Sequence, residues 1–166
     1  FGEDEIIDVK FPKLNEYDNF QKLKKEKEVI GIYISGHPLD AYRDRFKNYT
    51  FNSSMIAEED AESEQTAEGD EEETTVNNYG IEDGAKVTAG GVITVVNKVY
   101  TKAGNKAMAV LELEDLYGSF SVLVFNKLYE QIKEQLSTDK IVSISGKFSV
   151  REGERPIIVA EKIEFW

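Results

Sequence analysis

Short apolar runs separated by turn residues recur along the second half of the chain. Within the runs apolar and polar positions alternate, as at Ala109, Leu111 and Leu113, which share one face of a strand. Gly90-Gly91 falls inside the first run, where we expect a β-bulge or a sharp coil. The pattern predicts strands over residues 86–100, 107–114, 119–125, 140–150 and 156–165.

Residues 126–136 have helical rather than strand periodicity. Their apolar side chains fall on one helical face and their charged side chains on the other; the apolar set is Leu128, Tyr129, Ile132 and Leu136. Asn126 is placed to be the N-cap. A helix between the third and fourth of five strands is the layout of the OB-fold, a small Greek-key barrel. We therefore expect an all-β domain of this class.

The first part of the chain has a different pattern. Lys and Glu recur at helical spacing over residues 15–30, which predicts a helix that stops near Gly31. Residues 35–38 then predict a turn, and Asp40 is placed to cap a short second helix through Phe46. We expect Leu39 and Tyr42 on the buried side of that helix.

The charge is distributed unevenly. The formal net charge is −12, from 32 acidic and 20 basic residues, and twelve of the acids lie between Asn52 and Ala85, where there is no Lys or Arg. Outside this stretch the charges balance, so the net charge does not argue against a nucleic-acid partner. A run of like charge with few apolar residues is typical of a disordered linker. The sequence thus predicts a helical lead-in segment (1–51), an acidic flexible linker (52–84) and an OB-fold domain (85–166).

The composition excludes several kinds of site. There is no Cys and a single His, His37, so no usual zinc ligand set and no Cys nucleophile is available. We expect His37 to be a turn residue satisfied by local hydrogen bonds. The clustered acids are not held rigidly enough for catalytic magnesium. We expect no catalysis, metal or cofactor in this chain, no membrane segment, and a cytoplasmic monomer.

Three segments resemble a known family. Residues 26–40, which contain Ser35-Gly36-His37-Pro38-Leu39, are similar to the segment that precedes the OB domain in the alpha (catalytic) subunit of bacterial DNA polymerase III. Residues 101–109 and 113–118 resemble the first hairpin of that OB domain and the turn that follows it. The matches occur in the family's order, and together they cover most of residues 20–51 and 86–166.

The resemblance implies that the parent chain is a DNA-directed DNA polymerase, a nucleotidyltransferase of bacterial DNA replication, with its catalytic part upstream of Phe1. In that family a short sliding-clamp-binding peptide ending in Phe precedes this region, and Phe1-Gly2 would be its last residues. The linker departs from the family pattern, since it is longer and more acidic than expected.

Candidate nucleic-acid-binding residues gather at two predicted turns, which in OB-folds flank the face that binds oligonucleotides. Single strands are bound by cations along the backbone and by aromatic rings beneath the bases. The candidates are Lys98, Tyr100, Lys102, Asn105 and Lys106 around the first turn, Phe120 on the third strand, and Arg151 and Arg155 around the last turn. Phe148 lies on an alternating apolar face and fits the core better than the surface.

Three interpretations follow from these residues. The first is weak, non-specific binding of single-stranded template DNA, with a dissociation constant on the order of 10⁻⁴ to 10⁻⁵ M, in which the acidic linker competes for the same lysines. The second is a protein-interaction module that docks on the polymerase body or on a replisome partner, with the lysines as solvated loop residues. The third is an RNA-binding OB domain of the synthetase type, against which the segment Ser35–Leu39 argues.

Overall fold

The computed structural model describes residues 17–56, 79–151 and 154–166. The chain divides into two compact units, one ending at Pro38 and the other running from Leu39 to Trp166. The predicted end of a clamp-binding peptide, Phe1-Gly2, lies outside the described residues, as do residues 57–78 of the predicted linker. Both predictions therefore stay predictions.

The first unit contains one helix, α1 (Asn19–Ile30), within its described residues. α1 begins later than the predicted Asn15, because Asp18 caps it by accepting a hydrogen bond from the Gln21 amide at 2.8 Å. It ends at Gly31, whose φ of +85° is the left-handed conformation that glycine adopts readily. The following turn folds back on the helix, since the Glu26 carboxylate accepts hydrogen bonds from the amides of Ile34 and Ser35.

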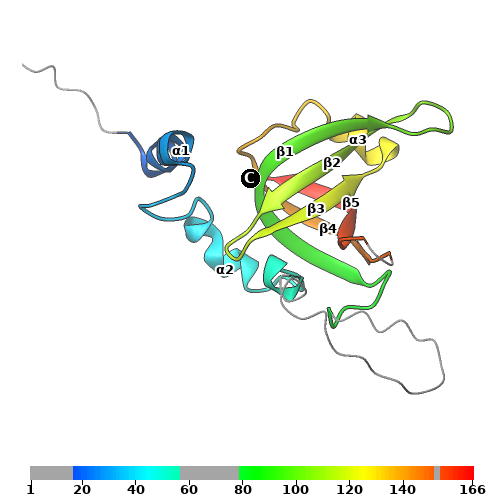
Figure 1. Ribbon diagram of the computed structural model, residues 1–166, viewed down its shortest axis with the longest axis horizontal. Coiled ribbons are helices and arrows are strands. Elements are labelled where there is room, and N and C mark those ends of the chain that lie inside the picture. The colour runs from blue at the N-terminus through cyan, green and yellow to red at the C-terminus, as the bar shows by residue number, and fades with distance from the viewer. Residues whose placement is uncertain (1–16, 57–78, 152–153) are drawn as a thin grey trace, which may run out of the picture. The chain divides into compact units, whose positions relative to one another are not determined.

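The second unit is a closed five-stranded barrel with the strand order β1-β2-β3-β5-β4 (Figure 1). β3 and β5 pair in parallel, whereas the other neighbours are antiparallel and β4 returns to pair with β1. This confirms the predicted OB-fold, including the position of α3. The elements are β1 (Lys86–Tyr100), β2 (Ala107–Glu114), β3 (Ser119–Val124), α3 (Asn126–Ile132), β4 (Ile141–Ser149) and β5 (Ile157–Phe165).

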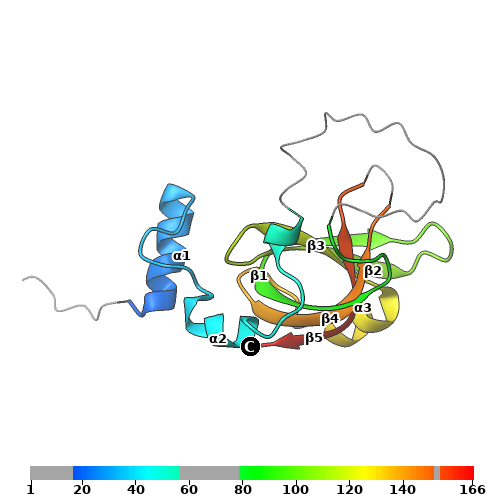
Figure 2. The same ribbon diagram turned by 90° about the horizontal axis from the view of Figure 1, so that it is seen from below.

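Alternation along the strands fills the barrel. The inward residues of β2, Ala109, Leu111 and Leu113, are fully buried. α3 packs on β2 and adds Tyr129 to the same core (Figure 2). The prediction of Asn126 as the N-cap was wrong: Phe125 occupies that position, and Asn126, inside the helix, donates its side-chain amide to the Ala107 carbonyl at 2.9 Å.

The bulge in β1 is not at the predicted Gly90-Gly91. Pairing with β4 is continuous through both glycines, and the register with β2 shifts between Ile93 and Val95 instead. Gly90 serves close packing, because a Cβ there would lie 2.0 Å from the ring of Phe46.

Residues 39–56 belong to the barrel unit rather than to a separate lead-in. They contain α2 (Arg43–Phe46), flanked by 3₁₀ turns at Asp40–Tyr42 and Ser53–Met55. Leu39 is fully buried against Val92 and Ile141. The predicted cap at Asp40 was wrong, since Asp40 lies inside the 3₁₀ turn and its carboxylate accepts from Arg43 Nε at 2.8 Å.

The last residues of the predicted linker also contact the barrel. The Gly84 amide donates to the Phe148 carbonyl at 2.7 Å, and the Asp83 carboxylate accepts from the Val150 amide at 2.9 Å. The ring of Tyr79 meets that of Phe148 edge-on. Residues 79–84 are therefore held to β4, and the described part of the barrel unit is longer than the predicted domain 85–166.

Candidate nucleic-acid interface

The outer side of β1, β2 and β3 forms a continuous surface. One rung is Asn97, Val110 and Leu123, and the next is Val95, Glu112 and Ser121. Val95 is 39% exposed, and the residues of β2 and β3 in these rungs are half-buried. We call this surface, defined by the two rungs, the outer face. It is largely uncharged, so its electrostatic character depends on the loops beside it.

The β1–β2 hairpin extends from one end of the outer face (Figure 1). Its turn is closed by a hydrogen bond from the Thr101 amide to the Lys106 carbonyl at 3.0 Å. Lys102, Asn105 and Lys106 are all exposed, as the sequence led us to expect, and Asn105 takes a positive φ of 50°. The two lysine side chains are thus displayed on a turn that hydrogen bonds hold in place.

Lys98 and Tyr100 lie on the other side of the hairpin from the outer face. Their strand partners are Ala109 and Ala107, which have inward parity, and the Lys98 side chain reaches the ring of Tyr129 on α3. Lys98 Nζ lies 5.2 Å from the ring centroid of Tyr100 and 6.0 Å from that of Tyr129. A hydrogen bond with Tyr100 raises the pKa of Lys98. The structure thus separates these two candidates from the lysines of the turn.

The β4–β5 connection lies at the opposite end of β3. Ser149 pairs with Ile157, and Ile157 pairs with Ser121 near the start of β3. Arg151 comes just after β4 and Arg155 just before β5, and both arginine side chains are exposed. Cationic side chains therefore stand at both ends of the outer face, separated by the length of β3, about 20 Å at roughly 3.3 Å per residue. The hairpin turn carries two lysines and no acid, whereas Glu152 and Glu154 lie between the two arginines, so the β4–β5 connection has no net charge.

Phe120 is not a surface aromatic residue. It is 3% exposed and its ring meets that of Phe51 edge-on at 5.2 Å between centroids, inside the core. Because Val122 and Val124 are buried and share its parity, alternation along β3 places Phe120 inward. This corrects the prediction of Phe120 as a stacking platform.

The sequence reasoning missed Phe125. It follows β3 directly, has the outward parity of Ser121 and Leu123, and is 49% exposed. The signal was present in the sequence, because the same alternation that buries Phe120 directs Phe125 outward. Phe125 lies at the hairpin end of β3, where a base could stack on its ring. Of the two aromatic residues predicted as stacking platforms, Tyr100 is the exposed one, at 54%.

A pocket of about 320 Å³ lies at the Arg155 end of the outer face. Its polar lining includes Glu112 of β2, Ser119 and Ser121 of β3, and Ser53, and the buried Phe120 and the half-buried Ile56 also border it. Tyr79 and Pro156 supply apolar walls, and Arg155 also lines the pocket. The Ser121 hydroxyl donates to Oε1 of Glu112 at 2.6 Å. We call this hollow the Glu112 pocket.

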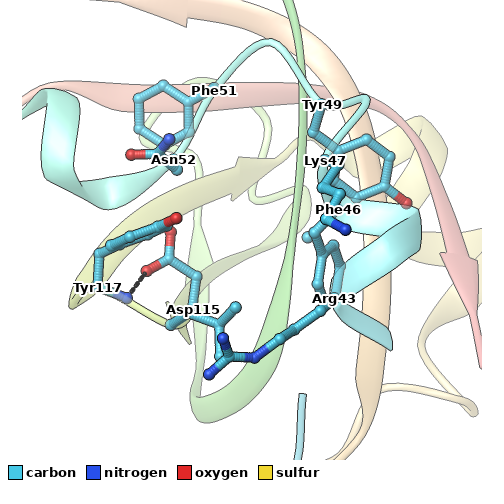
Figure 3. Close-up of a pocket in the computed structure, with 10 residues that line it drawn as sticks. Arg43, Phe46, Lys47, Tyr49, Phe51, Asn52, Asp115 and Tyr117 are labelled. Atoms are coloured by element: carbon cyan, nitrogen blue, oxygen red, sulfur yellow. Dashed lines mark hydrogen bonds between the residues drawn. The ribbon is translucent and has the colours of Figure 1, made fainter. Parts of the chain in front are cut away.

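A second pocket, of about 360 Å³, opens between residues 43–52 and the β2–β3 turn (Figure 3). Asp115 lies in it but is fully engaged: its carboxylate accepts from the amides of Ser53, Tyr117 and Gly118 and from the Ser53 hydroxyl. Arg43 and Lys47 face Asp115 and Tyr117 across the opening (Figure 3).

Both cations of this second pocket are already paired. Arg43 contacts Asp40 at 2.8 Å, and Lys47 contacts Asp44 at 2.6 Å. This pocket therefore offers less net positive charge to a phosphate than the β1–β2 hairpin turn, which carries Lys102 and Lys106 and no acid.

The described residues contain no cluster of three or more His, Asp or Glu that could hold a metal ion. His37 is half-buried, and its ring meets that of Tyr33 edge-on at 5.3 Å, inside the first unit. None of the helices in the described ranges is long and apolar enough to cross a membrane.

Comparison with known proteins identifies the domain. The model of the anticodon-binding family, described as an OB-fold nucleic acid binding domain, matches residues 87–165. DNA polymerase III subunit alpha of Treponema pallidum is 31% identical over 160 residues, which is 96% of this chain. The chain is a homologue of DNA polymerase III subunit alpha. The subunit of Aquifex aeolicus is 37% identical over 131 residues, or 79% of the chain.

The chain spans only about a tenth of these alpha subunits, 12% of the Treponema protein and 9% of the Aquifex protein. The matched stretch carries the OB domain, in agreement with the resemblance found in the sequence. Among solved structures, a mitochondrial single-stranded DNA binding protein of S. cerevisiae covers 51% of the chain and 96% of its own at 14% identity. Its TM-score against this chain is 0.43.

Proposed function

We propose that the barrel binds single-stranded template DNA, weakly, as the OB-fold region of a replicative DNA polymerase in the bacterial cytoplasm. The observation that carries the proposal is the placement of exposed cationic side chains at both ends of the outer face. Phosphates of a strand lying along β3 would meet Lys102 and Lys106 at one end and Arg151 and Arg155 at the other. Bases in between would lie on the largely uncharged rungs, in which Glu112 is the one charged residue, and on Phe125.

The expected affinity is low. Three to five phosphate contacts and few aromatic platforms correspond to a dissociation constant on the order of 10⁻⁴ to 10⁻⁵ M. Weak binding suffices inside a larger enzyme, because a tethered domain experiences a high effective concentration of the strand. Catalysis belongs in this proposal to other parts of the parent polymerase, and no cofactor is assigned to this chain.

The test is a fluorescence anisotropy titration of labelled oligo-dT at low and moderate salt. A variant with Lys102→Ala and Lys106→Ala should bind oligo-dT more weakly. Its affinity should also depend less on salt: the slope of log binding constant against log salt concentration should become shallower by about 0.7 for each phosphate that the protein no longer neutralises. The control with Lys47→Ala and Lys162→Ala removes the same charge from side chains that are 72% and 67% exposed elsewhere on the barrel unit. Equal weakening by both variants would contradict binding at the hairpin.

A second role is suggested by the first unit. Val29, Ile32 and Ile34 are 83%, 62% and 63% exposed, an unusual amount of apolar surface for so small a unit. We propose that this surface docks on the rest of the parent polymerase chain. Changing Ile32 and Ile34 to Ser should weaken association with the upstream part of the polymerase and leave oligo-dT binding by the barrel unchanged. Association that is unchanged in this variant would contradict the proposed docking of the first unit.

A further inference from the structure

The Glu112 pocket has the size and chemistry of a site for one base. Its volume of about 320 Å³ lies at the small end of the range typical of ligand pockets. Tyr79 and Pro156 give it apolar walls, and its polar lining comes from the neighbouring strands β2 and β3 and from Ser53 and Arg155. It opens on the outer face beside Arg155, so a strand bound as proposed above would pass over it.

Glu112 is the residue in the pocket best placed to recognise a base. Its side chain is half-buried on the outward side of β2, between Val95 of β1 and Ser121 of β3. The Ser121 hydroxyl fixes the carboxylate through Oε1, and within the described residues Oε2 accepts no hydrogen bond. The backbone is held as well, since Thr94 Oγ1 donates to the Glu112 carbonyl at 3.1 Å. The carboxylate is thus preorganised and retains acceptor capacity.

A fixed carboxylate distinguishes among the four bases. It only accepts hydrogen bonds, and guanine is the base whose Watson–Crick edge presents two adjacent donors, N1–H and N2–H₂. Adenine and cytosine present one amino group beside an acceptor nitrogen, and thymine presents one N–H between two carbonyls. Those acceptors would face the carboxylate oxygens, which is unfavourable.

We propose that the Glu112 pocket takes a guanine base of the single strand, with the Glu112 carboxylate accepting from N1–H and N2–H₂. Tyr79 and Pro156 flank the base, and Arg155 offsets the charge of the carboxylate and contacts an adjacent phosphate. The inference rests on the proposed function and adds to it a local base preference within otherwise non-specific binding.

The test compares three labelled strands of about twelve nucleotides, a length within the range that one OB-fold covers. One is oligo-dT, the second carries a single central dG, and the third carries dI, which retains N1–H but lacks the 2-amino group. The full chain should bind the dG strand about fivefold more tightly than oligo-dT, the lower end expected for a bidentate contact. The dI strand should fall between them.

Two variants assign the preference to the carboxylate. Glu112→Gln replaces one acceptor oxygen with a donor and should abolish the difference between the dG and dT strands. Glu114→Gln is the matched control, because it removes the same charge from the same side of β2 outside the pocket. It should preserve the difference.

The outcomes separate this inference from the proposed function. If the chain binds all three strands equally, or if Glu114→Gln abolishes the preference as Glu112→Gln does, the guanine site is refuted and single-strand binding stands. If the folded chain binds none of them at low salt, the proposed function fails and the inference fails with it.

Discussion

The same substitution at two aromatic positions five residues apart should have opposite consequences. Phe120→Ala removes a ring that is 3% exposed and packed on Phe51, whereas Phe125→Ala removes one that is 49% exposed at the end of β3. Truncating a buried Phe to Ala costs about 3–5 kcal/mol of unfolding free energy. Truncating a half-exposed Phe forfeits roughly half of the transfer free energy, about 1 kcal/mol. Only the first change should strongly destabilise the barrel.

The readouts are a thermal melt followed by circular dichroism and an oligo-dT titration. Phe120→Ala should lower the melting temperature by roughly 12 °C or more, at about 4 °C or more per kcal/mol for a domain of this size. Phe125→Ala should shift it little but weaken oligo-dT binding about fivefold, since one stacked base contributes about 1–3 kcal/mol.

The milder Phe120→Leu keeps the comparison usable if Phe120→Ala does not fold. It should also lower the melting temperature while leaving oligo-dT affinity unchanged. The reasoning from strand parity would be refuted if either Phe120 variant weakened DNA binding without loss of stability. It would be refuted equally if Phe125→Ala left binding intact.

Three further predictions concern the barrel closure, the first unit and the acidic segment. Gly146→Ala places a Cβ 2.2 Å from the Val159 carbonyl oxygen and should lower the free energy of unfolding measured in urea by about 3 kcal/mol. Ser145→Ala is the control and should change that free energy little. An equal loss in the two variants would contradict the close packing at Gly146. Hydrogen bonds from Ser35 hold the pKa of Glu26 below its ordinary value. The contact of the Glu26 carboxylate with Ile34 and Ser35 should therefore persist at neutral pH and disappear as the pH falls through that lowered pKa. Ser35→Ala should raise the pKa followed by NMR, and an unchanged midpoint would refute the contact. Replacing the ten acids between residues 57 and 78 with Asn and Gln should tighten oligo-dT binding at low salt, and unchanged affinity there would exclude competition.

Local sequence information specified the barrel. The alternation of Ala109, Leu111 and Leu113 and the helical spacing of Tyr129 and Ile132 each follow from the geometry of a single element. Their order along the chain was enough to identify the OB-fold, since the helix occupies its expected position. The same alternation along β3 places Phe120 on the buried side of the strand with Val122 and Val124. Its prediction as a surface residue rested instead on its being an aromatic residue near a turn.

Contacts between distant residues could not be predicted in this way. Leu39 packs on Val92 and Ile141, and Phe46 packs over Gly90, and nothing in the local pattern of residues 39–56 indicates that they cover the barrel. The bulge in β1 depends on how β2 and β4 pair with it, so its position was misjudged for the same reason. The Glu112 pocket also combines residues from segments far apart in sequence, which only the folded chain brings together.

The central claim is that single-stranded DNA lies along the outer face between the lysines of the β1–β2 hairpin turn and the arginines of the β4–β5 connection. The most direct measurement is an NMR titration of the isotopically labelled chain with oligo-dT. The amides of Val110, Leu123 and Phe125 should shift together with those of the hairpin, whereas that of Ser143 on β4 should not. Shifts confined to the second pocket around Tyr117, or spread evenly over the surface, would contradict the claim.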